Sequence, residues 1–282
     1  MTILIADAGG TSTQWCLVNH RSTHQFTTEG INPSFTSDAE MGFLIEQAAK
    51  KVSAMGLPEQ IYFYGAGCRP ESQKKRVKGA LTRSFPEATA TVFTDLEGAA
   101  RALYGTDSGL VLILGTGANS GYYNGENILQ NKNHLGFLLG DEGSGAWLGK
   151  TWLKAWITEN APTDLRRLFE NQYQLSPPEA LSTLYQTTHP NRYAADFVPF
   201  LKKHRQHPFI EHLLYNSFTT LCKTYLLKYP PENRQTIRAA GGIAIHFHEE
   251  LLQVFKDHHL TLNKVTHSPT AGLIRYHKLM HE

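Results

Sequence analysis

Two glycine-rich turns, each bordered by apolar segments, constrain the fold of this chain more than any other feature. The first turn, residues 7–13 (DAGGTST), lies between apolar residues 3–6 and 15–18. The second turn, residues 115–121 (GTGANSG), follows apolar residues 109–114. Apolar runs bounded by turn residues are typical of strands. A strand–turn–strand unit that recurs later in the same chain predicts a duplicated α/β fold, in which the two turns hold one nucleotide.

The first turn has the residues of a phosphate site. Glycines let the backbone approach a ligand closely, and N–H groups and hydroxyls at a turn suit phosphate oxygens. Asp7 has no basic neighbour in the turn, so a Mg²⁺ ion, bound directly or through water, is its natural partner. An ordinary tight turn with a solvated Asp7 is the alternative, because glycine-rich hairpins are common. The second turn repeats the pattern and favours the phosphate interpretation.

Composition argues against several classes of function. The chain has 282 residues, enough for one large or two modest domains with their own cores. Its net charge of +2, with histidines neutral, gives no reason to expect a nucleic-acid or membrane-surface partner. Three widely separated cysteines fit a reducing cytosol better than a disulfide framework. The first residues enter a strand directly, so we expect a cytoplasmic protein without a signal peptide or membrane span.

Hydrophobic periodicity predicts strands and helices along the rest of the chain. Further strands are predicted at residues 21–28, 61–64, 88–93, 234–240 and 260–265. Helices are predicted at residues 38–55, 71–83, 97–104, 243–257 and 270–280, and helices dominate from residue 145 to 229. The basic side chains of helix 71–83, Arg76 among them, are interpreted as a solvated face.

Two other nucleotide-binding motifs are incomplete. A Walker P-loop ending at residues 149–151 (GKT) needs a glycine where Ser144 stands, and it also lacks a preceding strand. A dinucleotide fingerprint starting at Gly115 needs a third glycine where Ser120 stands. We therefore reject both interpretations.

Two polar side chains stand where ligands are commonly bound. Asp95 lies between strand 88–93 and helix 97–104, at the position where open α/β sheets bind their ligands. Asp95 can also cap that helix, and the two roles are compatible. Asn32 precedes Pro33, which favours an extended backbone, and its amide can donate to and accept from a sugar hydroxyl or acetamide. A simple Asn-Pro turn is the alternative.

On these motifs the chain resembles the sugar kinase, heat-shock ATPase and actin superfamily. Residues 7–13 are similar to its first phosphate motif, residues 115–117 to its second, and residues 239–244 (AAGGIA) to its adenosine motif. Residues 134–145 (HLGFLLGDEGSG) resemble the N-acetylglucosamine kinase branch of the BadF/BadG/BcrA/BcrD-type ATPase family. These motifs extend over most of the chain.

The resemblance implies a two-lobed actin-like ATPase fold, which is ribonuclease H-like, with duplicated mixed sheets flanked by helices. The N-terminal lobe would comprise residues 1–108, completed by a C-terminal helix at residues 269–282. The C-terminal lobe would comprise residues 109–268.

The resemblance also implies an ATP-dependent amino-sugar kinase that needs Mg²⁺, with Asp7 at the metal and Asp95 as the catalytic base. N-acetylglucosamine, converted to its 6-phosphate, is the expected substrate, and N-acetylmuramate is the other sugar considered. The residues expected to bind ATP and its phosphates are Gly9, Gly10, Thr11, Thr13, Gly115, Thr116, Gly117, Gly241, Gly242 and Ala244. The residues expected to bind the sugar are Asn32, Asn119, Gly136, Phe137 and Asp141.

Two alternatives from other classes stay open. One is an ATP-driven activator of a 2-hydroxyacyl-CoA dehydratase-type enzyme, in which cysteine pairs hold an iron–sulfur cluster between two subunits. Each subunit would need two cysteines after the second turn, and only Cys222 follows residue 115. The other is a nucleotide-binding sensor without catalysis. The identity of the sugar, formation of a homodimer, nucleotide preference and the roles of Glu142 and Cys68 are not determined by the sequence.

Overall fold

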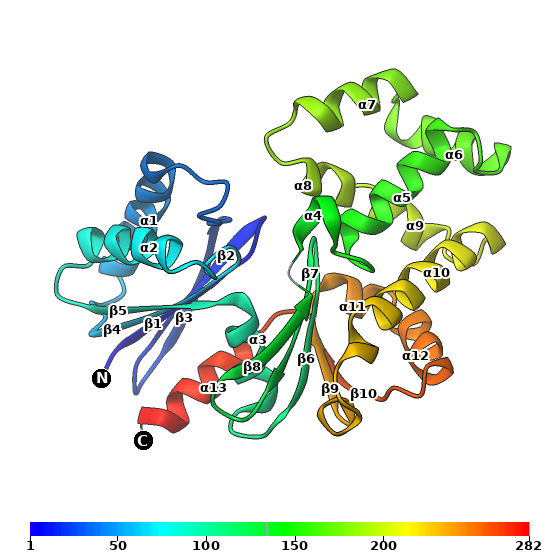
Figure 1. Cartoon of the computed structure of the whole chain (residues 1–282). Helices are drawn as coiled ribbons and strands as arrows, with labels where there is room; N and C mark the ends of the chain where they lie inside the picture. Colours follow the sequence, from blue (N-terminus) through cyan, green and yellow to red (C-terminus); the bar gives the residue numbers. More distant parts are fainter. Residues whose placement is uncertain (134, 282) are drawn as a thin grey trace. The chain divides into compact units, whose positions relative to one another are not determined.

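The computed structural model describes residues 1–133 and 135–281. His134, part of the predicted kinase motif, and Glu282, the end of the predicted C-terminal helix, lie outside the described residues. The chain divides into two units, which we describe separately (Figure 1). Unit 1 consists of Met1–Asp107, Gly125–Ile128 and Ser268–Glu282, and unit 2 consists of Ser108–Asn124 and Leu129–His267.

Each unit contains a five-stranded mixed sheet. In unit 1 the strand order is β3-β2-β1-β4-β5, and in unit 2 the sheet has the order β10-β9-β6-β7-β8. In both sheets a central strand pairs antiparallel with the next strand along the chain and parallel with a later one, as β1 does with β2 and β4 and β6 does with β7 and β9. The strands are β1 (Ile3–Ala8), β2 (Ser12–Val18), β3 (Thr23–Glu29), β4 (Gln60–Gly65), β5 (Thr89–Thr94), β6 (Gly109–Leu114), β7 (Ala118–Tyr123), β8 (Ile128–Asn133), β9 (Ile237–Ala240) and β10 (Leu262–Thr266). The predicted duplicated α/β fold is confirmed.

Alternation along β1 builds two cores in unit 1. Successive side chains of a strand point to opposite faces, and both faces of this sheet are covered. Leu4 and Ala6 pack under helices α1 (Asp38–Ser53) and α2 (Glu71–Ser84). Ile3 and Ile5 pack on the other face, under α3 (Asp95–Tyr104) and α13 (Thr270–His281). Asp7 follows Ile3 and Ile5 at the same spacing, so its side chain belongs to the α13 face.

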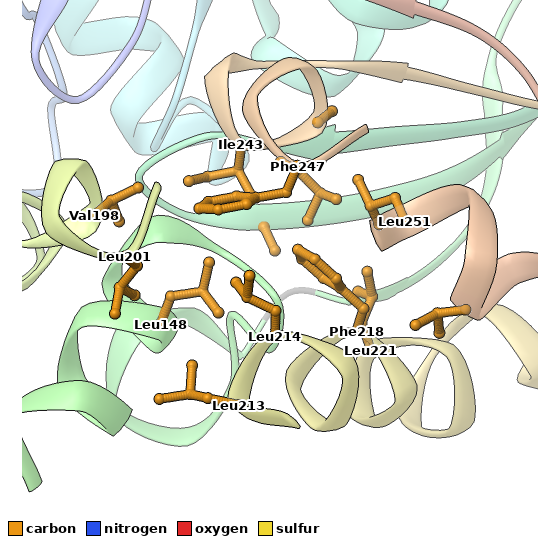
Figure 2. Close-up of a cluster of buried hydrophobic side chains, with 14 of the residues drawn as sticks. Leu148, Val198, Leu201, Leu213, Leu214, Phe218, Leu221, Ile243, Phe247 and Leu251 are labelled. Atoms are coloured by element: carbon orange, nitrogen blue, oxygen red, sulfur yellow. The ribbon is translucent and has the colours of Figure 1, made fainter. Parts of the chain in front are cut away.

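Unit 2 has one large core between its sheet and its helices. Figure 2 shows apolar side chains from several helices pointing toward one another, with Phe218 and Phe247 near the centre. Burial of each large apolar side chain contributes about 1.5–3 kcal/mol. The helices of this unit are α4 (Gly136–Leu139), α5 (Gly145–Ile157), α6 (Thr163–Tyr173), α7 (Pro177–Gln186), α8 (Pro190–Ala195), α9 (Val198–Lys203), α10 (Pro208–Thr224), α11 (Gly242–His246) and α12 (His248–Asp257), with two 3₁₀ turns at Leu226–Lys228 and Pro231–Arg234.

Several predicted helix and strand boundaries were wrong, those of segments 243–257, 234–240 and 97–104 among them. The predicted helix 243–257 is two helices, because the backbone of Phe247 (φ −119°, ψ 37°) leaves the helical region while its ring enters the core. The predicted strand 234–240 begins only at Ile237, because a 3₁₀ turn precedes it. The predicted helix 97–104 begins earlier, at Asp95.

None of the helices in the described part of the chain combines the length and apolarity needed to cross a bilayer.

Candidate active site

Asp7 ends the row of side chains that β1 presents to α13. Its register partner on β2 is Gln14. The Asp7 Oδ2 lies within hydrogen-bonding distance of the Ser268 hydroxyl at 3.2 Å and of the Thr270 hydroxyl at 3.4 Å. Burial raises the pKa of Asp7 from 3.8 to about 6, and the two hydroxyls oppose this rise because they favour the charged form. Asp7 is therefore a half-buried carboxylate held by the segment that begins α13.

The first turn is tied to the loop that carries Asn32. Gly9 N–H donates to the Ser12 carbonyl at 2.9 Å, and the Thr11 carbonyl accepts from Gly30 N–H at 3.0 Å. The Thr13 hydroxyl is fully buried and accepts from the backbone N–H of Ile31 at 3.1 Å. Among the residues predicted to bind phosphate in this turn, Thr11 is exposed, Gly9 and Gly10 are half-buried, and Thr13 faces the interior.

Gly67 and Arg76 contact the loop that carries Asn32. The Asn32 Oδ1 accepts from Ser34 N–H at 3.0 Å, and a Cβ at Gly67, whose φ is +78°, would overlap this oxygen. Arg76 of α2 donates to the carbonyls of Pro33 and Thr36. Arg76 also pairs with Asp38, so the prediction of a solvated face was wrong for this side chain. Asn32 thus makes the turn expected of an Asn-Pro pair and is held in a defined position.

Asp95 is the first residue of α3, directly after β5. The helix cap is Thr94, whose hydroxyl accepts from Glu97 N–H at 3.1 Å, while the Glu97 carboxylate accepts from Thr94 N–H at 2.8 Å. The alternative role of Asp95 as the helix N-cap was therefore wrong. Asp95 and Asp7 lie at the carboxyl edge of the same parallel strands, with β4 between β1 and β5. Strand spacing places β1 and β5 about 10 Å apart, and the two carboxylates lie at the edge where such sheets bind ligands.

In unit 2, the second turn is fastened to the start of α5. The carbonyls of Gly115 and Thr116 accept from Gly145 N–H at 2.8 Å and Ala146 N–H at 3.0 Å. These are the first N–H groups of the helix, so the turn caps α5 and leaves that helix end with protein partners. Gly117 lies against the Asp141 carboxylate, which would be 3.2 Å from a Cβ at this position.

Asp141 lies in a strained loop between α4 and α5. Its φ of +63° is uncommon for a residue with a side chain. The Oδ1 accepts from Ala118 N–H at 3.2 Å, and burial raises the pKa of Asp141 while Ala118 opposes the rise. The adjacent Glu142 accepts a hydrogen bond from the Tyr225 hydroxyl at 2.6 Å. The predicted sugar ligand Asp141 is thus a carboxylate that the second turn itself positions.

Lys150 is a cation at this site that the sequence analysis did not find. Its ammonium donates to the Phe137 carbonyl at 3.0 Å and lies 4.8 Å from the Phe137 ring centroid. Burial lowers the pKa of Lys150, and Asp141 and Glu142 oppose this change. In the sequence, Lys150 is marked only by the GKT residues 149–151, which do not form a P-loop. In the structure it lies on α5.

The remaining predicted residues of unit 2 fall into two groups. Asn119 lies on β7, where its Oδ1 accepts from the Asn131 side chain at 3.2 Å, while Gly136 and Phe137 form part of the short helix α4. In the predicted adenosine motif, Gly241 has φ of +127°, and its N–H donates to the Thr266 carbonyl at 2.9 Å. A Cβ at Gly241 would overlap the end of β6, just before the second turn. Gly242 begins α11 and Ala244 is fully buried.

The side chains near Asp7 decide whether this site can bind Mg²⁺. Within the described residues, no three His, Cys, Asp or Glu side chains gather as a metal site. Mg²⁺ usually keeps several waters and binds to one or two carboxylates together with substrate phosphates. The single carboxylate of Asp7, next to a glycine-rich turn, fits a Mg²⁺ that arrives with a nucleotide. The three cysteines are all buried, and burial raises the pKa of each thiol to about 12.

Comparisons with known proteins give full-length matches among solved structures. No protein-family model and no curated protein matches the chain. A "putative N-acetylglucosamine kinase" from Porphyromonas gingivalis is 36% identical, with 99% of this chain and 100% of that chain covered and a TM-score of 0.89. A second protein of that description, from Chromobacterium violaceum, is 18% identical, with 98% of each chain covered and a TM-score of 0.76. A ROK family glucokinase from Streptomyces griseus, solved with glucose and AMPPNP, is 16% identical, with 99% of each chain covered and a TM-score of 0.58.

Proposed function

Because this chain belongs to the sugar kinases of the actin-like ATPase superfamily, we propose that it transfers the γ-phosphate of ATP to a hydroxyl of an amino sugar. The full-length similarity to the Porphyromonas gingivalis protein carries this proposal, together with the GDEGSG sequence at residues 140–145. We propose N-acetylglucosamine as the substrate and its 6-phosphate as the product, with N-acetylmuramate as the second sugar to test. We also propose that the chain belongs to the N-acetylglucosamine kinase branch of the BadF/BadG-type family, on the motif at residues 134–145.

Phosphoryl transfer asks a protein mainly for positioning and charge stabilisation. In unit 1, the Gly9–Gly10 backbone and the Thr11 hydroxyl would lie against the phosphate oxygens, with Gly9 N–H kept in its hydrogen bond to the Ser12 carbonyl. In unit 2, the second turn would do the same, and Gly241 lets the adenosine motif pack directly against it. A bound Mg²⁺, held at Asp7 directly or through water, would neutralise phosphate charge.

Asp95 is the proposed general base. Its carboxylate would accept the proton of the sugar hydroxyl as that oxygen attacks the γ-phosphorus. Because Thr94 and Glu97 cap the N-terminus of α3 themselves, the Asp95 side chain is not needed as the helix N-cap. Asn32 and Asn119 would bind other sugar hydroxyls or the acetamide, and Asp141 would accept a hydrogen bond from a sugar hydroxyl.

A coupled ADP-release assay against a panel of hexoses and amino sugars tests this function. Wild-type turnover should depend on one amino sugar, and Asp95→Asn should lower kcat about 10²–10⁴-fold while nucleotide and sugar binding persist. Asp107→Asn is the matched control, because this exposed carboxylate follows the same helix. Near-normal turnover by Asp95→Asn would refute its role. Absence of sugar-dependent ADP release across the panel would refute the kinase assignment.

A further inference from the structure

Four side chains of unit 1, Asp7 among them, form one hydrogen-bonded group. The Ser268 hydroxyl lies 3.2 Å from the Asp7 Oδ2 and 3.2 Å from the Gln14 Oε1. The Thr270 hydroxyl lies 2.6 Å from the Gln14 Oε1 and 3.4 Å from the Asp7 Oδ2. The two hydroxyl oxygens are 2.8 Å apart. Two hydroxyls from one end of the chain thus face two acceptors at the other.

The protons in this group can be assigned by counting. Each hydroxyl has one proton to donate, while the Asp7 carboxylate and the Gln14 carbonyl oxygen can only accept. The shorter distance favours donation from Thr270 to Gln14. The Ser268 hydroxyl lies 2.8 Å from the neutral Thr270 oxygen and 3.2 Å from the Asp7 carboxylate. Because a charged acceptor makes the stronger hydrogen bond, we assign the Ser268 proton to Asp7; the Ser268 oxygen accepts from Thr270 N–H at 3.2 Å. In this arrangement each of the two hydroxyls has one acceptor.

This geometry leaves one Asp7 oxygen for a ligand. The Oδ2 is the atom that both hydroxyls approach, whereas the Oδ1 makes no hydrogen bond with any other part of the chain that the structure describes. Side chains that orient a metal-binding carboxylate commonly change metal affinity or activity about 10–100-fold when they are removed. Ser268 and Thr270 have the location and chemistry of such residues.

We propose that Ser268 and Thr270 are positioning residues, which hold the Asp7 carboxylate so that its Oδ1 faces the metal–nucleotide. The inference rests on the proposed function, because it assigns Asp7 to that ligand. Gln14 accepts the hydrogen bond from the Thr270 hydroxyl, so that the Ser268 hydroxyl donates to Asp7. The C-terminal segment therefore belongs to the active site as well as to the fold.

The first test is kinetic. Ser268→Ala and Thr270→Val should each lower kcat and raise the Mg²⁺ concentration for half-maximal activity by about 10-fold, with little change in the KM for the sugar. Thr270→Ser keeps the hydroxyl and should restore most of both values. The controls Ser53→Ala and Thr27→Val remove exposed hydroxyls of the same unit. Equal loss in Thr270→Ser and Thr270→Val would overturn the positioning role, because a merely structural threonine gives that result.

The second test needs no turnover. Calorimetry should show that Thr270→Val weakens binding of Mn²⁺–AMPPNP about 10-fold, while binding of AMPPNP in EDTA is unchanged. In an Asp7→Asn background the same substitution should have no further effect, because the carboxylate it serves is gone.

The outcomes separate the two claims. Wild-type protein that binds Mn²⁺–AMPPNP but phosphorylates no sugar would refute the proposed function alone. Equal binding of Mn²⁺–AMPPNP by wild type and Thr270→Val would refute the positioning role alone. Wild-type protein without metal-dependent binding would refute both.

Discussion

The substitution Asp7→Asn should stabilise the metal-free protein at neutral pH while abolishing phosphoryl transfer. Burial raises the pKa of Asp7 from 3.8 to about 6, so the folded state holds the proton more tightly than the unfolded state. Each pKa unit corresponds to about 1.4 kcal/mol, so ionised Asp7 costs the folded state about 3 kcal/mol. Asparagine is never charged, and the variant should gain about 1–3 kcal/mol, less than the full amount because its amide must also be desolvated.

The gain in unfolding free energy from Asp7→Asn should depend on pH. Well below the unfolded-state pKa of 3.8 the carboxyl is protonated in both states, so the Asp7 contribution to stability is fully present and the variant gains nothing. As the pH rises from about 4 through about 6, the folded state is forced to ionise a buried group and the wild type loses stability. The difference between variant and wild type should therefore grow over this window and become constant above about pH 7.

Urea unfolding in EDTA between pH 4.5 and 8, with hydrogen exchange of β1 and β2 amides to isolate unit 1, measures this difference. Glu29→Gln is the control, because this exposed carboxylate lies on the neighbouring strand β3 and should show no comparable gain. A variant that is less stable than wild type throughout, or a gain that is the same at pH 4.5 and pH 8, would refute the assignment of a desolvated carboxylate.

Three further perturbations test other parts of the chain. Gly241→Ala should cost about 2–5 kcal/mol of unfolding free energy, because a Cβ there meets a carbonyl at φ +127°. The matched Gly242→Ala should leave the urea midpoint nearly unchanged. Equal urea midpoints for Gly241→Ala and Gly242→Ala would contradict the packing argument. Tyr225→Phe should cost about 1–3 kcal/mol at pH 7, since it removes the 2.6 Å hydrogen bond of buried Glu142; an unaltered melting temperature would contradict this. Anaerobic iron–sulfide reconstitution should give no cluster absorbance, and a band lost in Cys222→Ser would revive the activator hypothesis.

The fold could be predicted because its determinants are local. Each apolar run and each glycine-rich turn is a short continuous segment of the sequence. Both turns are rich in glycine and hydroxyl residues. The helix boundaries depended on tertiary packing instead. The break at Phe247 exists because its ring enters the unit 2 core, and periodicity alone reads such a segment as one continuous helix.

The site was predicted only in part for a related reason. Residues in the turns and at strand ends, such as Asp7 and Asp95, are marked by their place in a local pattern. Arg76, by contrast, acts through Pro33, which lies 43 residues away. Ser268 meets Asp7 across 261 residues. Nothing near Ser268 or Arg76 in the sequence distinguishes them from solvated surface residues, because their partners are supplied by the fold.

The two corresponding hairpins, β1–β2 and β6–β7, carry different side chains at the same positions. The β1–β2 hairpin closes with Ala8 opposite Thr13, and the β6–β7 hairpin closes with Leu114 opposite Ala118. One position earlier, Asp7 faces Gln14 in unit 1, and Ile113 faces Asn119 in unit 2.

At this position of the hairpin, unit 1 has the carboxylate of Asp7 and unit 2 has the apolar side chain of Ile113. Unit 2 obtains its acidic group, Asp141, from the loop before α5, and the second turn fixes that group through Ala118 N–H. If Asp7 serves the metal–nucleotide and Asp141 the sugar, an Ile113→Asp variant should not replace Asp7. In unit 1 the Asp7 carboxylate is held by Ser268 and Thr270, whereas a carboxylate at the half-buried position 113 would replace an apolar side chain and should lower stability without supplying that function.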